Sequence, residues 1–362
     1  MRSPNNLRTR LTAAVVALAL PATALLPTSA GASTDNVNIV GYSVVGPAFT
    51  ALESAFQQTT AGAGVTFTNS FGASDTQTNN VANGQAADLV NLSYEPNITS
   101  LVSAGVVPSN WATQETTIAG VKLSGKSAAT TYATPGILTD SVVVFIVRKG
   151  NPLNVGTNWL SLTKPVNNKT ATVQIVTPNP TTSGSARWNL ISAYAAAIGA
   201  KYSKSKAIAF VRSIISETVA QPVSGSAAMS AFLAGTGNVL LDYEDDALAA
   251  VAKGDAISIV YPTQSIVIEN PAALTNTGLN NPGAVAFYKY LFSSAGQTIL
   301  ANLGYRPVLK SVWAATSTKF PGYAAKKLHL ITSLNANGWA VLNTQFFDPT
   351  SGIVTQLEQS LG

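Results

Sequence analysis

The chain has 362 residues, of which 21 are Lys or Arg, 16 are Asp or Glu, and none is Cys. The lack of Cys excludes disulfides, thiolate metal sites, cysteine nucleophiles and a lipid-modified N-terminal cysteine. His329 is the only histidine, so multi-histidine metal sites are excluded and a Ser-His-Asp hydrolase would need it as base. The length suits two domains, because single hydrophobic cores rarely grow beyond about 250–300 residues.

Residues 1–32 have the pattern of a secretory signal peptide. Three arginines precede a mainly apolar stretch at 11–26, and Ala30-Gly31-Ala32 fits the cleavage site. We therefore expect a mature chain from Ser33, exported to the periplasm or cell envelope without a lipid anchor. Those arginines are the only charged residues of the leader, so its removal lowers the formal net charge from +5 to +2. No Lys/Arg cluster remains that could bind a nucleic-acid backbone.

Strands and helices alternate through the first part of the mature chain. Residues 37–40, 65–67 and 87–92 are apolar runs typical of strands, and helices are expected to open at Gly46-Pro47 and at Pro96. This alternation predicts a largely parallel sheet that helices cover on both faces.

The alternation continues after a Thr-rich passage at 113–134. Further strands are expected at 141–148, 171–177, 239–243, 257–260 and 266–268. Further helices are expected around 188–198 and at 207–215, from 244 onward, at 284–292 and at 297–303. The pattern as a whole predicts two α/β lobes.

Two helix starts are candidate anion sites. Residues 178–185 (PNPTTSGS) lie between a buried strand and a long helix, where α/β folds bind ligands and where Ser183 can add a hydroxyl. Residues 71–75, with Ser74, repeat this arrangement, and Ser224-Gly225-Ser226 is a third candidate. Ordinary helix capping by these serines explains the same spacing, so both interpretations stay open here.

Enzyme motifs are absent from the sequence. It contains no G-x-S-x-G, H-E-x-x-H or G-x-x-x-x-G-K-[ST] pattern. Glu244, Asp245 and Asp246 are more typical of a helix N-terminus than of a calcium loop. His329 lies between two leucines, a position typical of a structural imidazole. A secreted hydrolase that uses His329 as its base is nevertheless the alternative from another functional class.

Six segments share motifs with one protein family. They are 70–77 (SFGASDTQ), 87–90 (ADLV), 142–152 (VVVFIVRKGNP), 176–188 (VTPNPTTSGSARW), 239–247 (VLLDYEDDA) and 304–307 (GYRP). In these segments the chain resembles the sulfate/thiosulfate-binding proteins of bacterial ABC importers. The resemblance implies an α/β, type II periplasmic-binding-protein fold whose two lobes, joined by crossover strands, close over one dehydrated oxyanion. It implies a monomeric binding protein with a membrane permease as partner, and no enzyme, cofactor or metal.

The resemblance also implies how the chain is divided. Residues 33–139 with about 262–345 would form lobe I, and 140–261 would form lobe II. Residues 346–362 would be a C-terminal segment that packs across the lobes.

By resemblance, the anion site takes donors from both lobes. Ser74 would give its hydroxyl and Ser43 its backbone N–H, and Tyr243 would occupy the aromatic position of the site. The other expected ligands are the Ser183 hydroxyl and the backbone N–H groups of Gly184, Ser185 and Gly225. Behind the site, Arg187 would brace the loop and Asp75 would lie close by.

We expect sulfate, and thiosulfate as well, as the ligand, because a site made only of donors leaves the proton of hydrogen phosphate unpaired. A receptor for phosphate or another tetrahedral oxyanion is the alternative. Two departures from the family bear on this choice. Tyr243 replaces an indole donor with a hydroxyl that can also accept, and Asp75 stands where a small residue is usual. We expect Asp75 to point to solvent and binding to change little between pH 6 and 8.

Overall fold

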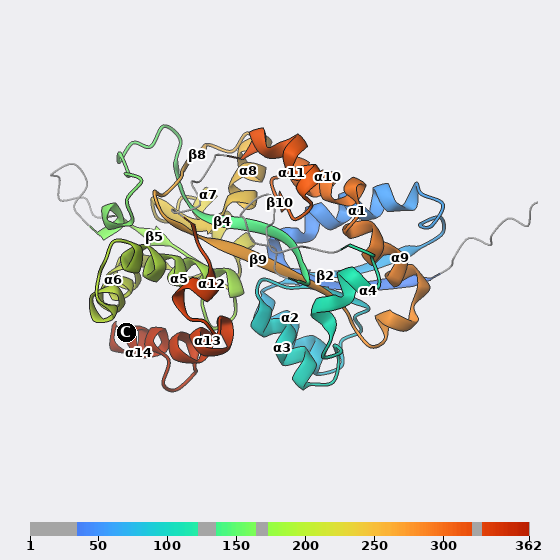
Figure 1. The fold of residues 1–362 in the computed structure, drawn as a ribbon. Helices are drawn as coiled ribbons and strands as arrows, with labels where there is room; N and C mark the ends of the chain where they lie inside the picture. Colours follow the sequence, from blue (N-terminus) through green and yellow to red (C-terminus); the bar gives the residue numbers. More distant parts are fainter. Residues whose placement is uncertain (1–34, 122–134, 164–172, 321–327, 362) are drawn as a thin grey trace, which may run out of the picture. The chain divides into compact units, whose positions relative to one another are not determined.

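The computed structural model describes residues 35–121, 135–163, 173–320 and 328–361. The predicted leader lies outside these ranges, as does part of the strand expected at 171–177. Within the described ranges, no helix combines the length and the apolar composition needed to cross a membrane. Figure 1 shows the order of the elements along the chain.

The first strands of the mature chain form a parallel group. β1 (Asn36–Tyr42) pairs in parallel with β2 (Thr66–Gly72) and with β3 (Leu89–Asn91). The helices that follow the three strands are α1 (Gly46–Gln57), α2 (Ser74–Ala82) and α3 (Glu95–Ser103). These elements confirm the strands and helices predicted for this region. Parallel strands end at one edge of a sheet, so the starts of these helices lie near that edge.

A second parallel group lies on the other side of the sheet. β5 (Ile175–Val176) pairs in parallel with β6 (Thr218–Ala220) and with β7 (Val239–Tyr243). Its helices are α5 (Gly184–Gly199), α6 (Lys204–Ser216), α7 (Gly225–Leu233) and α8 (Glu244–Lys253). Helices α5, α7 and α8 each begin after one of these strands, so their starts also share one edge.

Two long, buried strands connect the groups. β4 (Ile137–Arg148) and β9 (Ser265–Leu274) are antiparallel to each other, and β9 also pairs with β3 while β4 pairs with β7. The strand order is therefore β2-β1-β3-β9-β4-β7-β5-β6. The prediction of a largely parallel sheet is right for each group and wrong for the centre, because a buried apolar strand has the same sequence pattern in either direction.

Both connecting strands are longer than predicted, because buried polar residues extend them. Thr139 and Asp140 lie in β4, and Glu269 and Asn270 pair with them in β9. These polar residues interrupt the apolar runs in the sequence, so the runs predict strands only at 141–148 and 266–268.

Shorter elements complete the described chain. β8 (Ile257–Val260) and β10 (Arg306–Pro307) pair with β4, and β11 (Leu328–His329) pairs with β9. The remaining α-helices are α4 (Gln114–Thr117), α9 (Pro282–Leu291), α10 (Ser294–Asn302), α11 (Lys310–Thr316), α12 (Ile331–Leu334), α13 (Trp339–Phe347) and α14 (Ile353–Leu361). The 3-10 helices are η1 (Ser43–Val45), η2 (Trp111–Thr113), η3 (Trp159–Thr163), η5 (Gly278–Asn280) and η6 (Ser317–Lys319).

The C-terminal helices contact helices of both strand groups. Helix α14 packs against α6, and α13 packs against α3. Arg212 Nη1 donates to Ser360 Oγ at 2.7 Å, which ties α14 to α6. The Trp339 ring of α13 lies 4.7 Å, centroid to centroid, from Trp188 and 5.0 Å from Tyr94. The lobe boundaries at 139/140 and 261/262 stay a prediction.

Candidate functional site

The starts of η1, α5 and α7 meet at one place. The Ser226 N–H of α7 donates to Ser43 Oγ at 3.3 Å. A Cβ on Gly225 would lie 3.4 Å from Ser185 Oγ, at the first turn of α5. Ser185 Oγ in turn lies 2.7 Å from Ser183 Oγ. Four of the predicted ligands, Ser43, Gly225, Ser185 and Ser183, therefore belong to one contiguous group.

The start of α2 joins this group through Ser93, in the loop after β3. The Ser93 N–H donates to Ser74 Oγ at 2.8 Å, and Ser93 Oγ lies 3.4 Å from Tyr243 Oη. A Cβ on Gly184 would approach Ser93 Cβ to 2.6 Å, which only glycine tolerates at this contact. Ser74, Gly184 and Tyr243 are thus placed beside the other predicted ligands, and Ser93 is a member that the sequence did not reveal.

The serines of this site do not cap their own helices. Ser183 is the N-cap residue of α5, but its hydroxyl accepts no hydrogen bond from the first-turn N–H groups of that helix. Among the described residues, the hydroxyl contacts Ser185 Oγ instead. Ser74 is the first residue of α2, and its hydroxyl faces the Ser93 N–H. Ser224, in contrast, caps α7 by accepting from the Ala227 N–H at 3.2 Å. Capping therefore explains Ser224 but not Ser183 or Ser74.

The arrangement is suited to an anion. First-turn N–H groups of a helix have no intrahelical acceptor, and the helix dipole places about half a positive charge at that end. Ser74, Ser183 and Ser185 are each at most 6% exposed, so their hydroxyls are shielded from water. The predicted ligands include neither Lys nor Arg. The site therefore offers donors and dipoles rather than counter-ions.

Tyr243 can serve this site as a donor. Its side chain is fully buried, with its ring centroid 6.4 Å from that of Tyr42. Burial raises the pKa of Tyr243 well above the ordinary value of a phenol, and the charges of Asp245 and Asp242 raise it further. The hydroxyl consequently keeps its proton at neutral pH.

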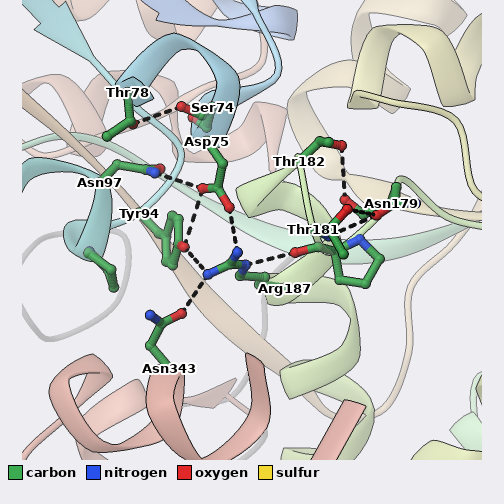
Figure 2. Close-up of polar contacts among 12 residues, drawn as sticks. Ser74, Asp75, Thr78, Tyr94, Asn97, Asn179, Thr181, Thr182, Arg187 and Asn343 are labelled. Atoms are coloured by element: carbon green, nitrogen blue, oxygen red, sulfur yellow. Dashed lines mark hydrogen bonds and ion pairs between the residues drawn. The ribbon is translucent and has the colours of Figure 1, made fainter. Parts of the chain in front are cut away.

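Asp75 does not point to solvent, and that prediction is wrong. Its carboxylate pairs with Arg187 Nη2 at 2.5 Å, and it accepts from Asn97 Nδ2 at 2.7 Å and from Tyr94 Oη at 3.3 Å. Figure 2 shows these groups around the carboxylate. A guanidinium and two neutral donors replace the water that a first-turn acid would otherwise face. The guanidinium belongs to Arg187 of α5, which lies more than a hundred residues after Asp75 in the sequence.

Arg187 also holds the loop before α5. Its Nε donates to the Pro180 carbonyl at 2.9 Å, and its Nη1 donates to Asn343 Oδ1 at 2.7 Å and to Tyr94 Oη (Figure 2). The Asp75 N–H donates to the Thr182 carbonyl at 3.1 Å. These bonds tie α2 to the loop that carries Ser183.

His329 lies outside this site. Its Nε2 contacts Gln264 Oε1 at 2.9 Å, and burial lowers the pKa of the imidazole. A Cβ on Gly199 would touch the same ring at 2.7 Å, so the ring packs against α5. Among the described residues, no group of three or more His, Cys, Asp or Glu is placed to hold a metal ion.

Known proteins share this sequence and fold. The family described as bacterial extracellular solute-binding protein matches residues 37–306. A sulfate-binding protein of Synechocystis sp. is 28% identical, over 90% of this chain and 87% of that protein. A thiosulfate-binding protein of Pseudomonas aeruginosa is 32% identical, over 78% of this chain and 81% of that protein. The chain belongs to the sulfate/thiosulfate-binding family of bacterial extracellular solute-binding proteins.

Solved structures agree with this assignment. The sulfate-binding protein SubI from Mycobacterium tuberculosis H37Rv has a TM-score of 0.76 and 35% identity, and the match covers 87% of this chain and all of that one. A periplasmic thiamin binding protein shares the fold alone, with a TM-score of 0.62 at 13% identity. The two-lobed α/β fold predicted for this solute-binding protein is confirmed, as is its place among binding proteins rather than enzymes.

The solute-binding protein has a second feature near the site that the sequence did not reveal. Asp242, at the end of β7, is 1% exposed; its Oδ1 accepts from the Tyr243 N–H at 2.9 Å and lies 3.7 Å from where a Cβ on Gly225 would be. Asp245 and Asp246 follow at the start of α8. The sequence predicted a helix N-terminus at these acids, as observed, but not the burial of Asp242 and Asp245.

Proposed function

We propose that this protein captures sulfate, and thiosulfate as well, where the starts of η1, α2, α5 and α7 meet, and delivers the anion to the permease of an ABC importer. The observation that carries the proposal is the grouping of buried hydroxyls and helix N-termini without a Lys or Arg side chain among the predicted ligands. The names of the relatives from Synechocystis and Pseudomonas support the same ligands.

The chemistry of the site fits an oxyanion that carries no proton. Charge-assisted hydrogen bonds are roughly twice as strong as neutral ones, so several of them can replace the hydration shell of a sulfate dianion. The Ser74 and Ser183 hydroxyls and the protonated Tyr243 supply donors from side chains. The first-turn N–H groups of Gly184, Ser185 and Gly225 supply donors from the backbone, as Ser43 does from η1.

Asp75 bears on the choice between sulfate and phosphate. A phosphate receptor needs an acceptor for the proton of hydrogen phosphate, and an inward-turned Asp75 could have supplied one. Instead, its carboxylate forms an ion pair with Arg187 and accepts hydrogen bonds from Asn97 and Tyr94. This pairing favours sulfate over phosphate at this position.

The place of action follows from the leader and the family. The protein acts outside the cytoplasmic membrane, in the periplasm or cell envelope, once residues 1–32 are removed. Residues from Ser33 onward form a compact unit of their own, which suits a mature chain that folds without the leader. We expect the protein to be a monomer and the permease to be its partner. Binding of the anion would draw together the two lobes, whose boundaries are predicted at 139/140 and 261/262.

Titration calorimetry tests this proposal. Protein that begins at Ser33, freed of bound anions, is titrated with sulfate, thiosulfate, phosphate and molybdate. We expect 1:1 binding of sulfate and thiosulfate, with no heat from phosphate. Binding of phosphate but not sulfate would contradict the assigned ligand, and no binding of any of the four would contradict an oxyanion receptor.

A further inference from the structure

We propose that binding of the anion is coupled to uptake of a proton by a cluster of three carboxyls, the buried Asp242 and Asp245 and the half-buried Asp246, which we call the carboxyl cluster. This inference rests on the proposed function, because it requires a dianion at the starts of α5 and α7. It makes Asp242 a residue that determines affinity, although its carboxyl is not among the predicted ligands.

The cluster is packed directly against the site. Asp242 lies between the Tyr243 backbone and Gly225, both of which are predicted to serve the anion. Burial raises the pKa of Asp242 most, and the charge of Asp246 raises it further. Asp242 Oδ2 and Asp246 Oδ2 are both buried oxygens without a hydrogen-bond partner among the described residues. Asp245 is 1% exposed and accepts from Ser141 Oγ at 2.5 Å. Three acids therefore adjoin a site built for negative charge.

The basic residues near the cluster do not neutralise all three acids. Arg306 forms a two-pronged pair with Glu244, at 2.6 and 3.1 Å, and Arg187 of α5 is bonded to Asp75. Lys253, on α8, lowers the pKa of Asp246. Helix α7 and strand β8 carry no charged residue. The other titratable or charged groups around the cluster, among the described residues, are Tyr42 on β1, Tyr243 on β7, Tyr305 before β10 and Lys319 of η6. On β4, Asp140 precedes Ser141, the residue that donates to Asp245.

The surroundings of the cluster raise the pKa values of its carboxyls. Burial raises the pKa of Asp245 to about 7 and that of Asp246 to about 6, and it raises the pKa of Asp242 well above the ordinary value of a carboxyl. A dianion bound next to Gly225 raises these values further, because like charges disfavour ionisation. The bound state then holds more protons than the free state, so affinity must rise as pH falls from the raised pKa values of the complex to those of the free protein.

A cavity gives protons a route to the cluster. It has a volume of about 390 Å³ and is lined by Asp245, Asp246 and Tyr305, together with Val44 and Pro47 next to the site. Lys253 and Lys319, both exposed, are also part of its lining, so the cavity reaches the surface. The cluster can therefore exchange protons with solvent from the side of α8 and α10, without passing through the anion site.

Calorimetry in paired buffers tests the coupling. Sulfate is titrated into the protein at pH 5.5, 6.5, 7.5 and 8.5, in two buffers of different ionisation enthalpy at each pH. We expect uptake of about half a proton or more at pH 7.5, and a Kd that rises by up to about tenfold per pH unit above the pKa of the free cluster, the limit for one linked proton. This measurement needs no variant.

Two variants locate the proton. Asp242→Asn and Asp246→Asn replace a carboxyl with a neutral amide, so we expect each to reduce proton uptake and flatten the dependence of Kd on pH. Asp255→Asn is the matched control: it removes an acid beyond the other end of α8, and we expect the wild-type pH profile. Wild-type profiles in both variants would leave Asp245 as the proton acceptor, and a wild-type profile in Asp245→Asn as well would overturn the assignment to the carboxyl cluster.

The outcomes separate this inference from the proposed function. Sulfate binding with no proton uptake and one Kd from pH 5.5 to 8.5 would overturn the inference and leave the receptor intact. No sulfate binding at any pH would overturn the receptor itself. The sequence predicts a flat profile between pH 6 and 8 because it reveals the donors of the site but not the burial of Asp242 and Asp245.

Discussion

At the scale of residues, the hydrogen-bond partner of each serine hydroxyl shows whether that serine caps its own helix or faces the anion site. The sequence predicted which serines stand at helix starts, and those positions are right. Whether a hydroxyl caps its own helix or faces another segment depends on tertiary contacts, such as Ser93 against Ser74. The sequence could not resolve this, because Ser93 lies in a loop without a motif. The prediction that Asp75 points to solvent is wrong for the same reason, since its partner Arg187 is remote in the chain.

Ser183→Ala tests the role of a single hydroxyl. Removing one donor to a buried charge should weaken sulfate binding by about 1–3 kcal/mol, or roughly 5- to 150-fold in Kd. Ser203→Ala is a matched control, because Ser203 caps α6 by accepting from the Lys206 N–H and belongs to no part of the anion site. Calorimetry should show a change for Ser183→Ala alone. Equal affinities in both variants and wild type would make Ser183 a structural residue only.

At the scale of elements, the pair between Asp75 and Arg187 links α2 to α5. Both side chains are at most 15% exposed, so the pair is only weakly screened by water. Arg187 adds bonds to Pro180 and Asn343, which extend the link to the loop before α5 and to α13. Helix positions were predictable from apolar spacing, whereas this link required two elements to be brought together by the antiparallel β4 and β9.

A double-mutant cycle tests the link. Asp75→Asn leaves Arg187 without its carboxylate, and Arg187→Gln leaves Asp75 without its cation, so each should lower the free energy of unfolding by about 1–3 kcal/mol. The double variant should be destabilised by less than the sum of the two, because the second change removes the group that the first left unpaired. Urea unfolding measures all four proteins. Strictly additive effects would mean that the pair does not couple α2 to α5.

At the scale of the whole molecule, the two parallel groups and the strands between them explain why the site lies where it does. β1, β2 and β3 end at helix starts on one side, and β5, β6 and β7 end at helix starts on the other. The alternation of strands and helices predicted each group. The polar interruptions in β4 and β9 concealed their full length, and the burial of the carboxyl cluster depended on packing that no single segment encodes.

The most direct test of the account is a crystal structure of the protein with sulfate bound. We predict one sulfate with its oxygens within hydrogen-bond distance of Ser74 Oγ and Ser183 Oγ and of the N–H groups of Gly184 and Gly225. Its oxygens should contact no Lys or Arg side chain. A sulfate held instead by a basic side chain, away from these helix starts, would contradict the central claim.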